Sequence, residues 1–229
     1  MSVTILKNPQ VSISLKSLGA ELISLQDASG CEYLWQGNPD FWSGQAPVLF
    51  PIVGCLRNQT ASISGDKTCS LGRHGLARKL EFSLVSSTET CAVFSLRSDE
   101  STKQQYPFDF ELQMIYELEE KGVKITHKII NHDSIPMPYC VGGHPAFNCP
   151  ISEGESFEDY VVEFEFPETA SCAQLDDAGL ILNDQRIPVL DNETKIPVKH
   201  SLFYQDALIF DELKSRKVSL KHKEEAKGI

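Results

Sequence analysis

Apolar and polar residues alternate along much of the chain, which is the pattern of half-buried β-strands. The clearest alternating sets are Val11, Ile13 and Leu15; Leu112, Met114, Tyr116 and Leu118; and Val123, Ile125, His127 and Ile129. The polar segment Glu119-Glu120-Lys121-Gly122 separates the last two sets. A short polar turn with glycine between two alternating runs predicts a β-hairpin.

Further strands are predicted at residues 81–85, 91–97, 160–166 and 207–210, with Gly, Pro, Asn and Asp between them. No long segment shows helical periodicity, and one short helical turn fits residues 39–42. The chain is therefore predicted to be all-β and largely antiparallel, a sandwich or a barrel. We find no internal repeat or linker, so we expect one domain over residues 1–229.

The charge and the cysteine pattern of the chain argue against several classes of function. The formal net charge of −11 argues against general binding to nucleic acid or to anionic membranes, which need a basic surface. No apolar run is long enough to span a membrane, and the first residues lack the order of a signal peptide. The seven cysteines are scattered without a C-x-x-C pair, so we expect free thiols in a reducing cytoplasm and no zinc site.

The most informative segment is Gly142-Gly143-His144-Pro145. A residue before proline favours extended backbone, so His144 is predicted on or at the end of a strand. The two glycines allow a ligand to approach the backbone closely. An imidazole with a pKa of about 6.5 can donate or accept a proton near neutral pH. The pattern alone fits a structural histidine as well as a functional one.

A second polar cluster covers residues 72–79. If this segment is extended, His74, Leu76 and Arg78 share one face and could bind hydroxyls, a carboxylate or a phosphate. The alternative is a solvated charged loop, which we favour for Arg73 and Lys79.

Three further features could take part in a binding site. Residues 47–58 read as a buried strand that delivers Arg57 at its end. Trp35 and Trp42 could offer a flat face to a sugar ring, although buried aromatic residues are more often part of a core. Asp206 is predicted to lead into a strand, where sugar hydroxyls or backbone N–H groups could satisfy its carboxylate.

Taken together, several of these segments resemble the aldose 1-epimerase (galactose mutarotase-like) family. Within that family, the resemblance is strongest to the LacX-like branch. The segments are Leu34-Trp35-Gln36-Gly37 with Phe41-Trp42, Leu49-Phe50-Pro51-Ile52-Val53-Gly54, His74-Gly75-Leu76-Ala77-Arg78, Gly142-Gly143-His144-Pro145-Ala146-Phe147-Asn148 and, more weakly, Asp206-Ala207-Leu208-Ile209-Phe210. The resemblance implies a β-supersandwich and a cofactor-free, metal-free interconversion of the α- and β-anomers of an aldose.

The resemblance also implies roles for individual residues. In the family a carboxylate base takes the proton of the C1 hydroxyl while a histidine acid protonates the ring oxygen. By position His144 is the general acid, and His74 binds the sugar and helps to polarise the ring oxygen or a neighbouring hydroxyl. Asp206, Arg57 and Arg78 are the implied substrate-binding residues, although a cysteine, at position 55, follows Gly54 where the family often has arginine.

The catalytic glutamate of the family lies in a C-terminal strand, after a segment like 218–220. The sequence ends at Ile229, before that point, and Glu224 and Glu225 lie in a predicted polar turn that does not match. We therefore expect the C-terminal strands of the family fold to be missing and epimerase activity to be weak or absent.

Three alternatives remain open at this point. One is a non-catalytic carbohydrate-binding or regulatory protein on the same fold, and a more distant one is a metal-dependent all-β sugar isomerase such as a cupin. The third concerns the substrate, a free hexose or a hexose phosphate, because Arg57, Arg73, Arg78 and Lys79 could form a local basic site.

Overall fold

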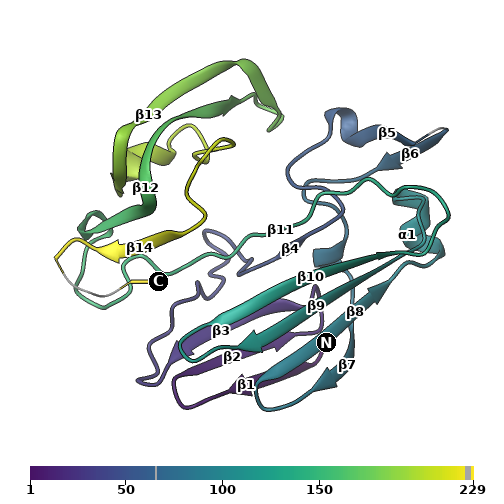
Figure 1. Ribbon diagram of the computed structural model, residues 1–229, viewed down its shortest axis with the longest axis horizontal. Coiled ribbons are helices and arrows are strands. Elements are labelled where there is room, and N and C mark those ends of the chain that lie inside the picture. The colour runs from purple at the N-terminus through teal and green to yellow at the C-terminus, as the bar shows by residue number, and fades with distance from the viewer. Residues whose placement is uncertain (65, 225–227) are drawn as a thin grey trace. The chain divides into compact units, whose positions relative to one another are not determined.

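The computed structural model describes residues 1–64, 66–224 and 228–229, and the chain forms two compact units, Met1–Phe147 and Asn148–Ile229 (Figure 1). The strands of every sheet pair in antiparallel fashion, so the predicted all-β, largely antiparallel architecture is confirmed. Within the described residues no helix is long and apolar enough to cross a membrane. Residues 225–227 of the predicted C-terminal turn lie outside the described residues.

The first unit contains two larger sheets and two short strand pairs. One sheet has the order β1-β2-β3, from β1 (Val3–Lys7), β2 (Val11–Lys16) and β3 (Glu21–Asp27). The other has the order β10-β9-β8-β7, from β7 (Ser83–Ser87), β8 (Cys91–Arg97), β9 (Phe110–Leu118) and β10 (Val123–Asn131). The short pairs are β4 (Val48–Leu49) with β11 (Gly142–Gly143), and β5 (Thr60–Ser64) with β6 (Lys67–Ser70).

The helical segments among the described residues of this unit are short. They are η1 (Arg57–Gln59), η2 (Ala77–Lys79) and α1 (Glu100–Gln105). The short helical turn expected at residues 39–42 is present as one isolated turn, in which the N–H groups of Phe41 and Trp42 both donate to the carbonyl of Asn38.

The predicted β9–β10 hairpin is confirmed, with Val123 paired to Leu118 across the turn. The strand expected at residues 91–97 is β8 with the same bounds, and the one expected at 81–85 begins two residues later, at Ser83. Alternation predicted β9 because most of its inward side chains are buried while its other face is less so, whereas β7 is exposed on both faces.

The core of the first unit lies between its two larger sheets. Ile13 and Leu15 of β2 are fully buried in the same hydrophobic cluster as Leu112 and Met114 of β9. Burial of one such side chain stabilises the folded state by roughly 1.5–3 kcal/mol. The alternating residues of both sheets therefore face each other and hold the sandwich together.

The second unit is a three-stranded sheet of order β13-β12-β14, from β12 (Tyr160–Leu175), β13 (Ile181–Pro197) and β14 (Val218–His222), with the turns η3 (Phe157–Asp159) and η4 (His200–Phe203). Its small core contains Phe164, Leu190 and Ile196. The strand predicted at residues 160–166 is the first part of β12, which continues to residue 175. β12 pairs with β13, and β-bulges or other irregularities shift the register at several points.

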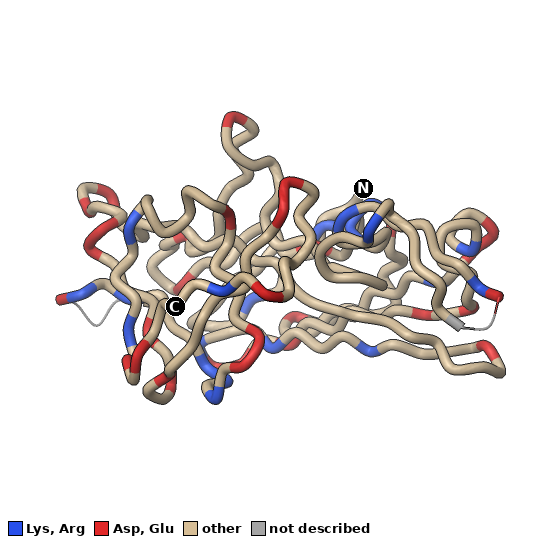
Figure 2. Tube along the Cα trace, turned by 90° about the horizontal axis from the view of Figure 1, so that it is seen from above, with Lys and Arg blue, Asp and Glu red and all other residues tan. Residues whose placement is uncertain are grey.

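Charged residues of both signs are interspersed over the trace of the chain (Figure 2). Several form exposed ion pairs, such as Arg186 with Asp211 and Lys124 with Glu117. Because exposed pairs contribute little to stability, the apolar cores rather than the charges hold the two units together internally.

One buried hydrogen bond links the two sheets of the first unit. The hydroxyl of Tyr116 donates to the carbonyl oxygen of Ala20 at 2.6 Å, and both residues are buried. We expect Tyr116→Phe to lower the free energy of unfolding by about 1–3 kcal/mol, because it leaves a buried carbonyl unpaired. Urea unfolding measures this loss, and Tyr204→Phe, which removes a hydroxyl from an 80% exposed side chain, is the control. An equal effect of the two substitutions would contradict the assignment.

Candidate functional site

The two motif histidines lie together in the first unit. The ring centroids of His74 and His144 are 5.6 Å apart, with an angle of 69° between the ring planes. His144 directly follows β11, which pairs with β4, and its N–H donates to the carbonyl of Pro47 at 3.1 Å. His74 lies in the loop that contacts the segment immediately after β4. One short segment, residues 45–54, therefore binds the backbone of both histidines.

The backbone around His74 is left-handed, with φ of +66° at His74 and +73° at Gly75. An added Cβ at Gly75 would lie 2.2 Å from the carbonyl oxygen of Phe50, so glycine is required there. That carbonyl accepts the N–H of Leu76 at 2.9 Å. A histidine in this sparsely populated conformation is held by its surroundings, which is typical of functional sites.

The prediction that His74, Leu76 and Arg78 share one face of an extended segment is therefore wrong. Instead, the loop turns through two left-handed residues, and Arg78 lies in the turn η2. The physical reason is non-local, because the loop follows the carbonyl of Phe50 rather than a partner strand.

Hydrogen bonds fix the tautomer of His74. The N–H of Gly54 donates to Nδ1 of His74 at 3.0 Å, and the N–H of His74 donates to the carbonyl of Gly54 at 2.8 Å. Since Nδ1 must provide a lone pair, the proton of the neutral ring is on Nε2. In the neutral ring, Nε2–H is therefore a donor that has no hydrogen-bond acceptor among the described residues. The sequence motif contained Gly54 but gave no sign of this role.

Burial lowers the pKa of His74 below its ordinary value, and the positive charges of His144, Arg78 and Arg73 lower it further. Desolvation and like charges both disfavour the imidazolium form. Arg73, which was predicted to be a solvated loop residue, is indeed exposed but contributes to this effect. His74 therefore stays neutral at pH values where an ordinary histidine is partly charged.

His144 differs from its neighbour because its side chain is exposed. Its ring also lies against the indole of Trp42, with the centroids 5.2 Å apart and the planes tilted by 43°. Backbone hydrogen bonds secure the segment on both sides, from Ala146 N–H to the carbonyl of Gln45 at 2.8 Å and from Trp35 N–H to the carbonyl of Ala146 at 2.9 Å. A rigid backbone thus presents an accessible imidazole.

The segment that holds both histidines is itself anchored by a buried carboxylate. Glu21 is 5% exposed and accepts the N–H groups of Gln45 and Ala46 at 3.0 and 2.9 Å. Its second oxygen pairs with the ammonium of Lys16. Charge-assisted hydrogen bonds of this kind are among the stronger ones in proteins. They tie the candidate site to the β1-β2-β3 sheet.

The two predicted arginines take different positions. Residues 47–58 do not form one buried strand, because only β4 is regular and the chain then turns at Gly54, where φ is +82°. Arg57 consequently lies exposed in η1. Arg78 is half-buried, and its Nε is buried without a hydrogen-bond partner among the described residues. Arg78 is therefore the arginine that belongs to the surroundings of His74.

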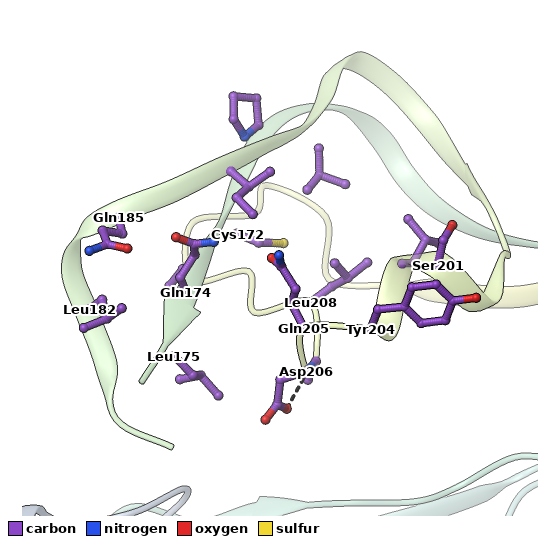
Figure 3. A pocket seen from close by; sticks show the side chains of 16 residues that line it. Cys172, Gln174, Leu175, Leu182, Gln185, Ser201, Tyr204, Gln205, Asp206 and Leu208 are labelled. Carbon is purple, nitrogen blue, oxygen red and sulfur yellow. Dashed lines mark hydrogen bonds between the residues drawn. The ribbon is translucent and has the colours of Figure 1, made fainter. Parts of the chain in front are cut away.

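Asp206 belongs to the second unit, where it lines a pocket of about 820 Å³ (Figure 3). Figure 3 shows Gln205 and Asp206 on one side of this pocket and Gln174 of β12 on the other. One carboxylate oxygen of Asp206 accepts the N–H of Ala207 at 2.6 Å, and the side chain is exposed. Most of the lining is apolar, from residues such as Leu175, Ile187 and Leu208, and Asp206 is its acidic group.

The strand predicted at residues 207–210 is wrong. These residues form only one isolated bridge, between Ile209 and Ala173, and Asp206 precedes them with φ of +109°. Leu208 and Phe210 nevertheless pack against the small core of this unit, as their apolar character indicated.

Metal-ligand side chains are dispersed in the described part of the chain. No group of three or more His, Cys, Asp or Glu side chains there could hold a metal ion. The seven cysteines are all free.

This arrangement of strands is that of galactose mutarotase-like proteins. The structure matches a galactose mutarotase related enzyme from Lactobacillus acidophilus with a TM-score of 0.90 and 33% identity, covering 97% of this chain and 74% of that one. The predicted supersandwich class is thereby confirmed.

Sequence comparison gives the family. The model of the aldose 1-epimerase family matches residues 2–229, so the chain belongs to this family of carbohydrate epimerases. It is 40% identical to the plasmid-encoded protein LacX of Lactococcus lactis subsp. lactis over 98% of this chain and 77% of that protein. It is also 32% identical to a putative glucose-6-phosphate 1-epimerase of Escherichia coli K12, over 49% of this chain and 38% of that protein.

The environment of His74 predicts its titration. We expect nuclear magnetic resonance (NMR) to give a pKa below 6.5, and Arg78→Gln to raise this pKa because it removes one of the nearby charges. Since the folded state disfavours the protonated form, the contribution of His74 to stability is complete above about pH 6.5 and is lost as the pH falls through the lowered pKa.

Arg57→Gln is the matched control for this titration. Arg57 is exposed and is not among the charges that shift the pKa of His74, so its removal should leave that pKa unchanged. A pKa of His74 at or above 6.5 in the unaltered protein would contradict the described environment.

Proposed function

We propose that this protein is an aldose 1-epimerase that interconverts the α- and β-anomers of an aldose by opening and closing the sugar ring, with activity impaired because none of the described residues is assigned as the carboxylate base of the family. The observation that carries the proposal is the pair of histidines, with ring centroids 5.6 Å apart, that two separate family motifs supply. We also propose that residues 1–229 form one galactose mutarotase-like domain and act in the cytoplasm.

His144 is the general acid in this proposal. Its exposed imidazole can reach a bound sugar and donate a proton to the ring oxygen as the bond from that oxygen to C1 breaks. In the family mechanism a carboxylate accepts the proton of the C1 hydroxyl as the aldehyde forms, and rotation about the C1–C2 bond with the reverse proton transfers closes the ring on the other face. We assign this carboxylate to none of the described residues. The proton of the C1 hydroxyl then passes to solvent water, and turnover is slow.

His74 has a different role because its ring stays neutral. Its Nε2–H can donate a hydrogen bond to the ring oxygen or to a neighbouring hydroxyl, while Gly54 holds Nδ1 in place. A neutral donor stabilises the negative charge that develops on oxygen without competing with His144 for the proton. Arg78 and Arg57 are the substrate-binding residues that we propose for the first unit, and Asp206 is the one that we propose for the second unit.

The proposal predicts the effect of removing the acid. Exchange NMR on the anomers of glucose and galactose measures the enzyme-dependent rate of interconversion. We expect His144→Gln to lower that rate by about 10²–10⁴-fold, which is the usual contribution of a general acid. His132→Gln, which alters an exposed histidine of the same unit, should leave the rate unchanged. Equal rates in the His144→Gln variant and the unaltered protein would rule out this role.

The same experiment separates the proposal from a carbohydrate-binding protein without turnover. Saturation-transfer NMR reports binding independently of exchange. Binding of either anomer without faster exchange would favour the non-catalytic alternative over the epimerase.

We further propose that the site accepts a hexose phosphate as well as a free hexose. The support is the positive charge of Arg73 and Arg78 near His74, together with the similarity to the putative glucose-6-phosphate 1-epimerase. A guanidinium can contact a phosphate through two parallel hydrogen bonds. In this proposal Arg73 and Arg78 bind the phosphate group, next to the histidines that bind the sugar.

This extension predicts a salt-sensitive preference. We expect galactose 6-phosphate to bind more tightly than galactose at low salt, with the difference shrinking at high salt because ions screen the contact. Arg73→Gln should remove much of the difference, whereas Lys79→Gln, an exposed cation that does not shift the pKa of His74, should not. Calorimetric titration at two salt concentrations measures it, and equal affinities for both sugars would refute the phosphate site.

A further inference from the structure

The indole of Trp42 is held in one place by its own loop. An added Cβ at Gly44 would lie 2.4 Å from Cζ2 and 2.7 Å from Cε2 of this indole. The ring therefore packs directly on the backbone of Gly44, a contact that no other residue type permits at that position without a shift. The side chain is half-buried.

The backbone of Trp42 is held as well. Its carbonyl accepts the indole N–H of Trp35 at 2.7 Å, and its N–H donates to the carbonyl of Asn38 at 2.9 Å. Trp35 in turn donates its backbone N–H to the carbonyl of Ala146, two residues after His144. The loop that carries Trp42 and the segment that carries His144 are thus joined by a direct hydrogen bond.

The imidazole of His144 has few other restraints. Neither of its nitrogens makes a hydrogen bond within the described part of the chain, and the side chain is exposed. Its ring neighbours are Trp42 at 5.2 Å and His74 at 5.6 Å between centroids. An exposed imidazole without hydrogen bonds would otherwise rotate among its staggered conformers.

We propose that Trp42 is the positioning residue of His144, with its indole face restricting the imidazole to the orientation in which it faces His74 and a bound sugar. The face of the indole attracts a cation. The contact between Trp42 and His144 therefore persists when the imidazole is protonated and ready to donate its proton. A fixed donor orientation matters because misplacement of a catalytic group by about 1 Å can cost about 10²-fold in rate. The role in turnover rests on the proposed epimerase function, whereas the ring contact does not.

The first test is independent of activity. The three-bond couplings between Hα and the two Hβ protons of His144 report its side-chain rotamer in NMR. In Trp42→Leu we expect these couplings to become averaged, as in an unrestrained histidine. Phe41→Leu is the matched control, because this neighbouring aromatic residue is 82% exposed and contacts Trp35 instead. Unchanged His144 couplings in Trp42→Leu would overturn the proposal.

The second test measures turnover. We expect Trp42→Leu to lower kcat by about 10- to 10²-fold with a smaller change in KM, and Trp42→Phe to recover part of the loss. A rise in KM at constant kcat would instead mean that Trp42 stacks on the sugar, and would also overturn the proposal.

Gly44→Ala provides a variant that keeps the indole but displaces it. We expect it to reproduce both the averaged His144 couplings and the loss in kcat, and normal values for both would count against the proposal. If the unaltered protein shows no enzyme-dependent exchange, the epimerase function fails, but the His144 couplings still decide whether Trp42 orients the ring.

Discussion

The candidate site depends on the hydrogen bonds that a single short segment, residues 45–54, makes on both of its sides. Its carbonyl at Pro47 accepts the N–H of His144, and its carbonyl at Phe50 accepts the N–H of Leu76. Its N–H at Gly54 then fixes the ring of His74. Because both histidine-bearing segments bind to the same stretch of backbone, the two rings meet although they are far apart in the sequence.

This segment is stiff because it is tied to the core. The carboxylate of Glu21 holds it at Gln45 and Ala46, and Glu21 begins β3 of a sheet that contributes the buried side chains of Ile13 and Leu15 to the core. A site supported by packed strands keeps its donors in place better than one carried by free loops. His74 and His144 differ in chemical character because this support leaves the first half-buried and the second exposed.

Much of the fold could be predicted from alternation, and parts of the site could not. β2, β8 and the β9–β10 hairpin follow from side chains whose burial differs between the two faces. The motifs also identified both histidines. The conformation of His74 was missed, because the carbonyl of Phe50 imposes it from a distance. Arg57 was misplaced because the turn at Gly54 ends the predicted strand early.

The sequence by itself determined which faces are buried and which residues carry titratable groups beside glycine and proline. These properties are local, since each strand shows its own period and each motif its own flanking residues. Only the tertiary structure decided that His74 is a neutral donor and that Trp42 lies against His144. Both depend on contacts between segments distant in the chain, and such contacts exist only once the strands have paired and packed.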